Sequence, residues 1–196
     1  MTSRSKPGSA SHRTWSRIIA LAVGMLLPVA AAGPTTASAG ALSEYEVKAA
    51  LLYNFAKFVE WPANAFPSPD APFVIGVLGS DPLGSSLVRL LAGKTVTGRA
   101  IVIRLWVGPR DRGPCQMLFV AGSERSGLKQ LLRDIDQQPV LTVADMSEFA
   151  VQGGMIGLIV EDNRLRFEIN TEGTDRAHLR ISSRLLSLAR IVSTSH

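Results

Sequence analysis

The side chains best suited to chemistry in this sequence are cationic and lie close to its C-terminal end. Arginine guanidinium groups bind carboxylates and phosphates through paired hydrogen bonds, and histidine changes its charge near neutral pH. If the final segment packs beside the strand that carries the first of these residues, several of them converge. We therefore predict a site for a small anionic ligand, such as a cell-wall fragment or a nucleotide. The candidate residues are Arg164, Arg166, Arg176, His178, Arg180 and Arg184.

The alternative for this segment is an ordinary solvated surface. Acidic residues stand among the arginines, and exposed ion pairs of this kind contribute little free energy. The acidic residues are Glu161, Asp162, Glu168, Glu172 and Asp175. The residue types alone agree with both interpretations, so the choice depends on how the segments pack.

The residues that bond-breaking chemistry usually requires are sparse. His178 is the one histidine between residues 13 and 195, so a histidine general base would have to be this residue. The sequence has no Gly-x-Ser-x-Gly turn for a serine nucleophile, and it cannot supply the cysteine and histidine ligands of a zinc site. A carboxylate site at Asp145 and Glu148 is conceivable, but nothing else favours it. We expect a protein that is not an enzyme, with no catalytic residue, metal or cofactor.

A second candidate site is aromatic and lies in a predicted N-terminal helix. Ser43 and Glu46 fit a capping box at its start, and the Trp61-Pro62 pair ends it. Residues at helical spacing predict its core side, namely Val47, Leu51, Phe55 and Phe58. Tyr53 and Trp61 fall partly outside this stripe, and exposed aromatic side chains are typical anchors of protein interfaces. We predict partner binding through Tyr53 and Trp61, with core packing an equal alternative for Trp61.

Strands and helices alternate along the rest of the chain. Short apolar runs predict strands at residues 73–78, 100–106, 117–120 and 140–143. Helical patterns follow at residues 82–91, 128–135 and 147–151, and again at 181–192. A hairpin is expected at residues 155–160 and 165–169, with Leu165, Phe167 and Ile169 buried and the residues between them exposed. This order predicts an α/β fold with a mainly parallel sheet flanked by helices on both faces, in a Rossmann-like three-layer arrangement, and an antiparallel hairpin near the C-terminus.

The turn at residues 79–82 joins a predicted strand to a predicted helix. Such a turn can bind an anion at the helix N-terminus. It lacks both the dinucleotide motif and the phosphate-loop lysine, which favours a purely structural turn.

The first 39 residues have the pattern of a secretory signal peptide. Four basic residues precede an apolar run at residues 18–32, and Ala37-Ser38-Ala39 places small residues where a signal peptidase cleaves. A membrane anchor is the alternative, but a spanning helix needs about 20 apolar residues, and this run is shorter and contains Pro28. We predict cleavage near Ala39, export to the periplasm and a single domain over residues 40–196.

The net charge of the chain bears on whether it binds nucleic acid. The chain has a net charge of +5, but four of its 21 basic residues and none of its 16 acidic residues lie in the first 39. Residues 40–196 therefore carry +1, which gives no electrostatic argument for binding nucleic acid.

Cys115 is the only cysteine, so no internal disulfide can form. It begins an apolar run and is expected to be a buried small hydrophobe, with an intermolecular disulfide as the alternative.

Several segments, in their order and spacing, resemble the YfiR family of periplasmic proteins. They are residues 44–50, 53–62, 75–79, 141–143, 153–156, 166–170 and 181–186. The most specific are the first two and the Arg-Phe-Glu-Ile-Asn block at 166–170. The resemblance covers nearly all of residues 40–196.

The resemblance implies a regulatory role. It implies a repressor that binds the periplasmic sensor domain of an inner-membrane diguanylate cyclase, and so lowers cyclic-di-GMP and biofilm formation. It also implies a homodimer. The best-known member of the family has cysteine pairs, whereas this chain has Cys115 alone, so redox sensing through an internal disulfide does not carry over.

Overall fold

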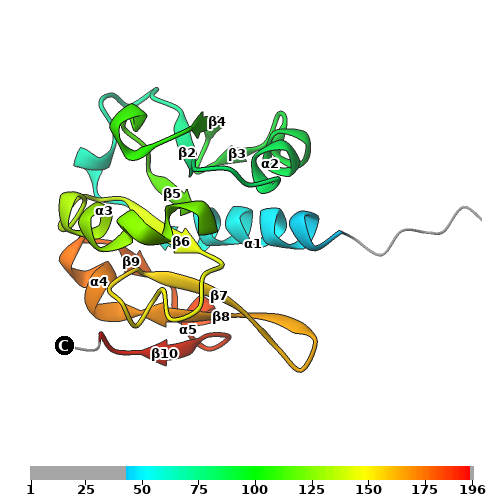
Figure 1. Cartoon of the computed structure of the whole chain (residues 1–196). Coiled ribbons are helices and arrows are strands. Elements are labelled where there is room, and N and C mark those ends of the chain that lie inside the picture. The colour runs from blue at the N-terminus through cyan, green and yellow to red at the C-terminus, as the bar shows by residue number, and fades with distance from the viewer. Residues whose placement is uncertain (1–42, 195–196) are drawn as a thin grey trace, which may run out of the picture. The chain divides into compact units, whose positions relative to one another are not determined.

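The computed structural model describes residues 43–194, and Figure 1 shows how their helices and strands are arranged. The predicted signal peptide and its cleavage point lie outside the described residues. The first helix, α1 (Glu44–Phe58), begins at the predicted capping box. The backbone N–H of Glu46 donates to the Ser43 hydroxyl, and the N–H of Ser43 donates to the Glu46 carboxylate. These bonds satisfy amide groups that a helix start otherwise leaves without partners.

The strands form two separate sheets. The larger sheet contains β2 (Phe73–Leu78), β3 (Thr95–Val96), β4 (Arg99–Trp106), β5 (Met117–Val120), β6 (Leu141–Ala144), β7 (Ile156–Glu161), β8 (Arg164–Asn170) and β10 (Arg190–Val192). Its strand order is β10-β8-β7-β6-β5-β2-β4-β3. The smaller sheet pairs β1 (Val59–Glu60) with β9 (Arg180–Ile181).

Most of the large sheet is parallel. The adjacent strands β4, β2, β5, β6 and β7 all run in the same direction. The exceptions are β8, which forms an antiparallel hairpin with β7, β10, which pairs parallel with β8, and β3, which pairs antiparallel with β4. The hairpin turns at Asp162 and Asn163, whose φ angles are +50° and +57°, as a tight two-residue turn requires. The α/β class, the mainly parallel sheet and the hairpin are confirmed, and the Rossmann-like three-layer description stays a prediction.

The remaining helices are short connections between strands. They are α2 (Leu83–Leu91), α3 (Leu128–Asp134), α4 (Thr171–Arg176) and α5 (Ser183–Leu186), with the 3-10 turns η1 (Ala63–Ala65), η2 (Pro109–Asp111) and η3 (Gly122–Gly127). Both α2 and α3 lie between strands of the parallel part of the sheet, where a crossover connection is needed.

The side chains of β5 divide the core into two apolar clusters. Met117 and Phe119 are buried in one cluster with α1 and α2. Leu118 and Val120 are buried in the other with α3. Because successive side chains of a strand point to opposite faces, this central strand is covered on both sides.

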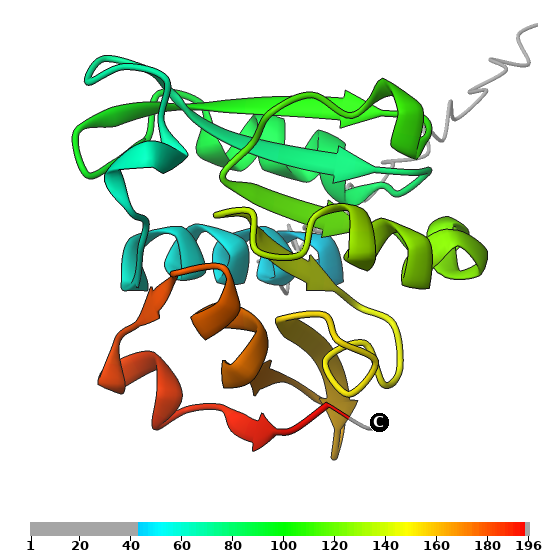
Figure 2. The same ribbon diagram turned by 90° about the vertical axis from the view of Figure 1, so that its left-hand side faces the viewer.

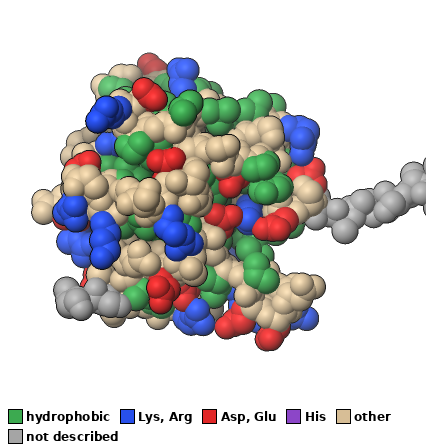
Figure 3. Space-filling view, in the orientation of Figure 1, with side chains coloured by type: hydrophobic (Ala, Val, Ile, Leu, Met, Phe, Trp, Pro, Cys, Tyr) green, Lys and Arg blue, Asp and Glu red, His purple; other side chains and the backbone are tan. Residues whose placement is uncertain are grey.

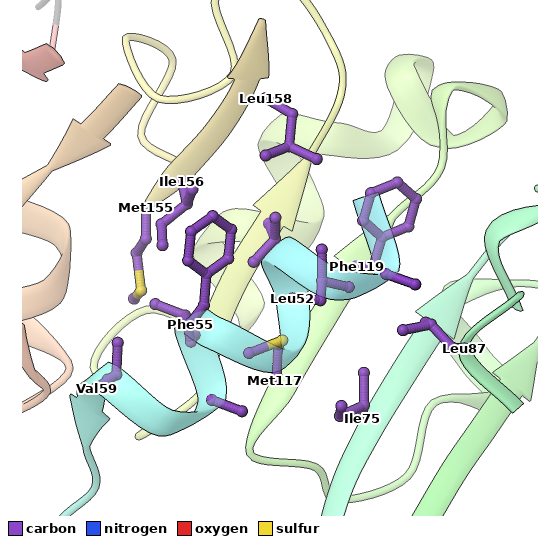
Figure 4. Close-up of a cluster of buried hydrophobic side chains, with 14 of the residues drawn as sticks. Leu52, Phe55, Val59, Ile75, Leu87, Met117, Phe119, Met155, Ile156 and Leu158 are labelled. Carbon is purple, nitrogen blue, oxygen red and sulfur yellow. The ribbon is translucent and has the colours of Figure 1, made fainter. Parts of the chain in front are cut away.

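Figure 4 shows how α1 contributes to the larger cluster, with Leu52 and Phe55 beside Met117 and Ile156 of the sheet, and Val59 of β1 directly after the helix. The buried positions of α1 differ from the predicted stripe: Phe55 is buried as expected, but the other buried apolar residues are Ala49, Leu52 and Ala56. The alanines lack bulk, which lets the helix backbone lie close to the strands. The larger apolar residues of the predicted stripe lie at the margin of this contact and are only half-buried.

The structure corrects two predicted helices. Residues 181–192 do not form one helix, because Ile181 belongs to β9, α5 is short, and Arg190 to Val192 form β10. Pairing with β1 and β8 therefore overrides the helical spacing of this segment. Residues 147–151 form turns rather than the predicted short helix.

The predicted exposure of the second hairpin arm is half correct. Arg166 is exposed as expected, but Glu168 is 6% exposed and Asn170 is fully buried. Glu168 is covered because Arg190 of β10 pairs with its carboxylate. Asn170 caps α4 by accepting a hydrogen bond from the N–H of Gly173 and donates to two backbone carbonyls. The Arg-Phe-Glu-Ile-Asn block is thus largely structural.

Candidate ligand-binding site

A two-residue strand pair fixes the end of α1 against a segment more than a hundred residues away. Glu60 of β1 lies opposite Arg180 of β9 in antiparallel register. The N–H of Ser182 extends this pairing by donating to the carbonyl oxygen of Phe58 at 3.0 Å. Figure 2 shows β9, in orange, approaching the end of α1.

Trp61, the residue after β1, is held from two sides. Its indole Nε1 donates to the carbonyl oxygen of Gln116 at 3.0 Å. Its ring packs edge-to-face on Phe73, with the ring centroids 4.8 Å apart. Gln116 is buried and its side-chain amide bonds to the backbone of Val74 and Ala65. The indole is therefore fixed in orientation and is only partly exposed.

His178 has an unusual backbone conformation. Its φ angle is +56°, in the left-handed region that normally takes glycine or asparagine after a helix end. Its N–H donates to the carbonyl oxygen of Asp175 at 3.0 Å, and the N–H of Leu179 donates to that of Thr174 at 2.9 Å. A histidine in this position costs free energy relative to glycine. Positive φ angles also occur at Thr97, Gln137, Glu148, Asp162 and Asn163.

These two segments line one pocket of about 490 Å³. Its lining residues are Glu60, Trp61, Pro62, Asp175, His178, Leu179 and Arg180. The charged side chains are two carboxylates and one guanidinium, beside an imidazole and an indole. A ligand suited to this set has an anionic group for Arg180, hydrogen-bond donors for the carboxylates and a flat or apolar part for Trp61.

Of the six predicted ligand residues, the structure brings only His178 and Arg180 into this pocket. Arg176 pairs with Asp136 at 3.1 Å and lines a separate pocket beside α3. The predicted convergence required a final helix beside the hairpin, and the chain forms β9, α5 and β10 there instead.

The other three arginines lie outside this pocket, two on a solvated surface and Arg184 in a separate pocket beside α1. Arg166 pairs with Glu161 of the hairpin at 3.4 Å, and Arg164 is exposed at the start of β8. The guanidinium of Arg184 lies 5.6 Å from the ring centroid of Phe58. Figure 3 shows that basic and acidic side chains are interspersed over the face it presents. For Arg164 and Arg166 the structure favours the alternative of a mixed, solvated surface.

Tyr53 and Trp61, the predicted partner-binding residues, do not form one surface. Tyr53 is half-buried, and its hydroxyl donates to the carbonyl oxygen of Thr95 at 3.4 Å. Two ammonium groups approach its ring, those of Lys57 and Lys94, at 5.4 Å and 5.7 Å from the centroid. Trp61 combines core packing with a share of the pocket, and partner binding by either residue stays a prediction.

A buried lysine near the start of α1 was not found by sequence reasoning. The ammonium of Lys48 donates to the carboxylate of Asp145 at 2.7 Å and also pairs with Glu44. Its side chain is 6% exposed. Burial by itself lowers the pKa of Lys48, but the hydrogen bonds to Asp145 and Glu44 more than offset this and raise its pKa above the ordinary value. The start of this helix looks solvent-exposed in the sequence, so nothing in the sequence indicates that Lys48 is buried.

The turn after β2 is filled by the protein's own side chains. Gly79 has a φ angle of +91°, and the N–H of Ser80 donates to the hydroxyl of Ser123 at 3.1 Å. Ser123 and Glu124 occupy the space that a side chain at residue 79 would need. Desolvation raises the pKa of Asp81 in the same turn. This crowded, acidic setting favours the structural interpretation of the turn.

Cys115 is 4% exposed. Burial raises the pKa of its thiol to about 11, against the smaller opposing effect of Arg112. This agrees with the expectation of a buried small hydrophobe.

Two absences hold for residues 43–194. Among these residues, no group of three or more histidine, cysteine, aspartate or glutamate side chains is arranged to hold a metal ion. None of the helices formed by these residues has the length and hydropathy needed to cross a membrane.

The fold and the pocket define an α/β protein with a small polar pocket at the end of α1. The model of the YfiR/HmsC-like family matches residues 45–190. The match spans most of the chain, and the chain belongs to this family of regulatory proteins. No curated protein matches the chain.

Proposed function

We propose that this chain is a periplasmic regulator that represses an inner-membrane diguanylate cyclase by binding the periplasmic sensor domain of the cyclase. Repression lowers cyclic-di-GMP and biofilm formation. The observation that carries the proposal is the family match over residues 45–190. The proposal includes export, with residues 1–39 acting as a signal peptide that is removed near Ala39.

The physical requirement for such a repressor is differential affinity. A binding protein shifts a receptor between active and inactive states only as far as its affinities for the two states differ. Lowering the ratio of active to inactive receptor tenfold needs a difference of about 1.4 kcal/mol. This requires no bond-breaking residue, in keeping with the single internal histidine of the chain.

The test is a deletion strain that carries the gene back on a plasmid in two forms. We expect deletion to raise cyclic-di-GMP and biofilm formation, the full chain to restore both, and the chain without residues 1–39 to fail because it stays in the cytoplasm. Immunoblots of the periplasmic and cytoplasmic fractions control for expression. Unchanged cyclic-di-GMP after deletion would contradict the proposal, and full rescue by the unexported form would contradict a periplasmic site of action.

A second candidate function is a periplasmic binding module for a small anionic ligand. The observation that favours it is the pocket at the end of α1, which brings Trp61, His178 and Arg180 together. Because Glu60 and Asp175 share this pocket, the ligand should carry hydrogen-bond donors as well as an anionic group. The two functions are compatible, since a ligand at the end of α1 can bias the affinity for a partner.

Titration calorimetry with soluble cell-wall fragments and nucleoside monophosphates tests this second function. We expect Arg180→Ala to abolish the heat of binding and Arg164→Ala, an exposed arginine outside the pocket, to leave it unchanged. Equal binding by Arg180→Ala and the unmodified protein would contradict a site at this pocket, and so would the absence of heat with every compound.

A further inference from the structure

A pocket of about 500 Å³, separate from the one at the end of α1, lies where the parallel strands of the large sheet begin. Val74 of β2 lines it together with Cys115 and Gln116, which come just before β5, and Val140, which precedes β6. Residues from the segment 64–72 form a further wall. Figure 2 shows this segment, in teal, before the start of β2. We call this cavity the amino-end pocket, and its volume is within the range of small-molecule sites.

The wall formed by residues 64–72 is held in place by two polar side chains. The amide of Gln116, which is 4% exposed, donates to the carbonyl oxygen of Ala65 at 2.6 Å and accepts from the N–H of Val74 at 2.8 Å. The guanidinium of Arg99 donates to the carbonyl oxygen of Ala71 at 2.6 Å. Four prolines, whose rings fix the φ angle, also line the pocket: Pro67, Pro72, Pro114 and Pro139. The pocket is therefore preformed, which reduces the ordering cost of binding a ligand.

The side chains that line the amino-end pocket are mostly apolar. Its polar side chains, apart from the thiol of Cys115, are three amides and one guanidinium, namely those of Asn64, Gln116, Gln138 and Arg112. Burial raises the pKa of the Cys115 thiol to about 11, so this group is neutral at pH 7. Among the lining residues within 43–194, Arg112 is thus the only one that carries a charge.

Arg112 is half-buried and has no acidic partner. None of the ion pairs formed within residues 43–194 includes it. Its guanidinium lies close enough to the Cys115 thiol to oppose the rise in the pKa of that group, which places the charge at the pocket wall. A partly desolvated cation is unfavourable until it is paired, and a guanidinium pairs with a carboxylate through two parallel hydrogen bonds.

We propose that the amino-end pocket binds a small monocarboxylate with an apolar body, and that the carboxylate of this ligand pairs with Arg112. The apolar body of the ligand contacts Val74, Val140 and the prolines of the wall. A phosphate ester or a dicarboxylate carries a second negative charge, for which the lining residues within 43–194 offer no second cation. The cavity and its single charge therefore favour a ligand with one negative charge.

This inference rests on neither of the functions proposed above. Octanoate is a suitable probe, and for a ligand of its size we expect a dissociation constant on the order of 100 µM in titration calorimetry with the purified exported protein. Octanamide has the same chain without the charge and should bind about tenfold more weakly. Arg112→Ala should weaken octanoate binding by about the same factor and leave octanamide binding unchanged, which also shows that the variant is folded. Arg112→Lys, which keeps the charge, should lose less affinity.

Two matched variants control for the position of the charge. Arg110→Ala removes an exposed arginine of η2 that does not line the amino-end pocket. Arg180→Ala removes the guanidinium of the pocket at the end of α1. Both variants should bind octanoate as the unmodified protein does, and loss of binding in Arg180→Ala would overturn the assignment to the amino-end pocket.

Protection of Cys115 shows where octanoate binds. A ligand that binds the folded pocket stabilises it, so octanoate at ten times its dissociation constant should slow modification of the thiol about tenfold. The quantity compared is the ratio of the rates with and without octanoate in each protein, because Arg112 itself affects the thiol. Octanoate that binds without protecting Cys115 would overturn the proposal. So would equal binding of octanoate and octanamide, undiminished octanoate binding by Arg112→Ala, or the absence of binding.

Discussion

Glu60 and Arg180 lie opposite each other in the β1–β9 pair, and this pairing places Trp61 and His178 in the walls of one pocket. The two strands are only two residues long, yet they join the end of α1 to the segment after α4. The pocket therefore depends on a contact between distant parts of the chain. Changes at either strand should alter ligand binding without altering the rest of the sheet.

The backbone of His178 gives a prediction for stability. At a φ angle of +56°, His178→Gly should raise the free energy of unfolding by about 1 kcal/mol, because glycine has no Cβ to strain the left-handed conformation. His178→Val should lower it. Thermal unfolding followed by circular dichroism measures both. As a control, Glu172→Gly within α4 should destabilise, since its backbone is helical. A destabilised His178→Gly would show that the imidazole contributes more than the strain costs.

The ion pair between Lys48 and Asp145 gives a second prediction. Lys48→Met should lower the free energy of unfolding by about 2 kcal/mol, because it leaves a partly buried carboxylate without its charged donor. Adding Asp145→Asn should recover part of the loss, since the two changes remove the same interaction. Denaturant unfolding measures these values. As a control, Lys129→Met at an exposed position of α3 should change the free energy of unfolding by less than about 0.5 kcal/mol. A loss as large as that of Lys48→Met would contradict a stabilising role of the Lys48–Asp145 ion pair.

Cys115 gives a prediction that depends on pH. Its thiol has a pKa of about 11 in the folded protein against 9.0 when exposed. The stability that comes from burying the neutral thiol is therefore fully present below pH 9 and is lost as the pH rises through 11. Cys115→Ala should remove this part of the alkaline destabilisation, measured by denaturant unfolding between pH 8 and 11. An unchanged alkaline profile would contradict the burial of the thiol.

The burial of Cys115 also predicts that its thiol reacts slowly near neutral pH. The thiolate is the reactive form, so a thiol-specific reagent at pH 8 should modify the native protein far more slowly than the protein unfolded in guanidinium. Rapid modification of the native protein would show that Cys115 is accessible, and an intermolecular disulfide would then become feasible.

Sequence reasoning succeeded where the physical signal is local. The capping box at Ser43 and Glu46 and the turn at Asp162 and Asn163 are fixed by side chains within a few residues of each other. The buried strands β2, β5 and β6 were visible as apolar runs, because strands of a parallel sheet are covered on both faces.

Sequence reasoning failed where pairing between distant segments decides the structure. Residues 181–192 have helical spacing, but Ile181 pairs with β1 near the start of the fold and Arg190 pairs with β8. The same pairing separates Arg176 and Arg184 from Arg180. The joint position of Trp61 and His178 has no sequence signature, because it results from two strands too short to show a pattern.

Reconstitution tests the central claim most directly. A membrane diguanylate cyclase from the same cell, placed in vesicles with its sensor domain facing outward, is titrated with the purified exported protein while cyclic-di-GMP production is measured inside. The account predicts saturable inhibition that is lost when the sensor domain is removed from the cyclase. Unchanged production at saturating protein, or equal inhibition of the cyclase without its sensor domain, would contradict it.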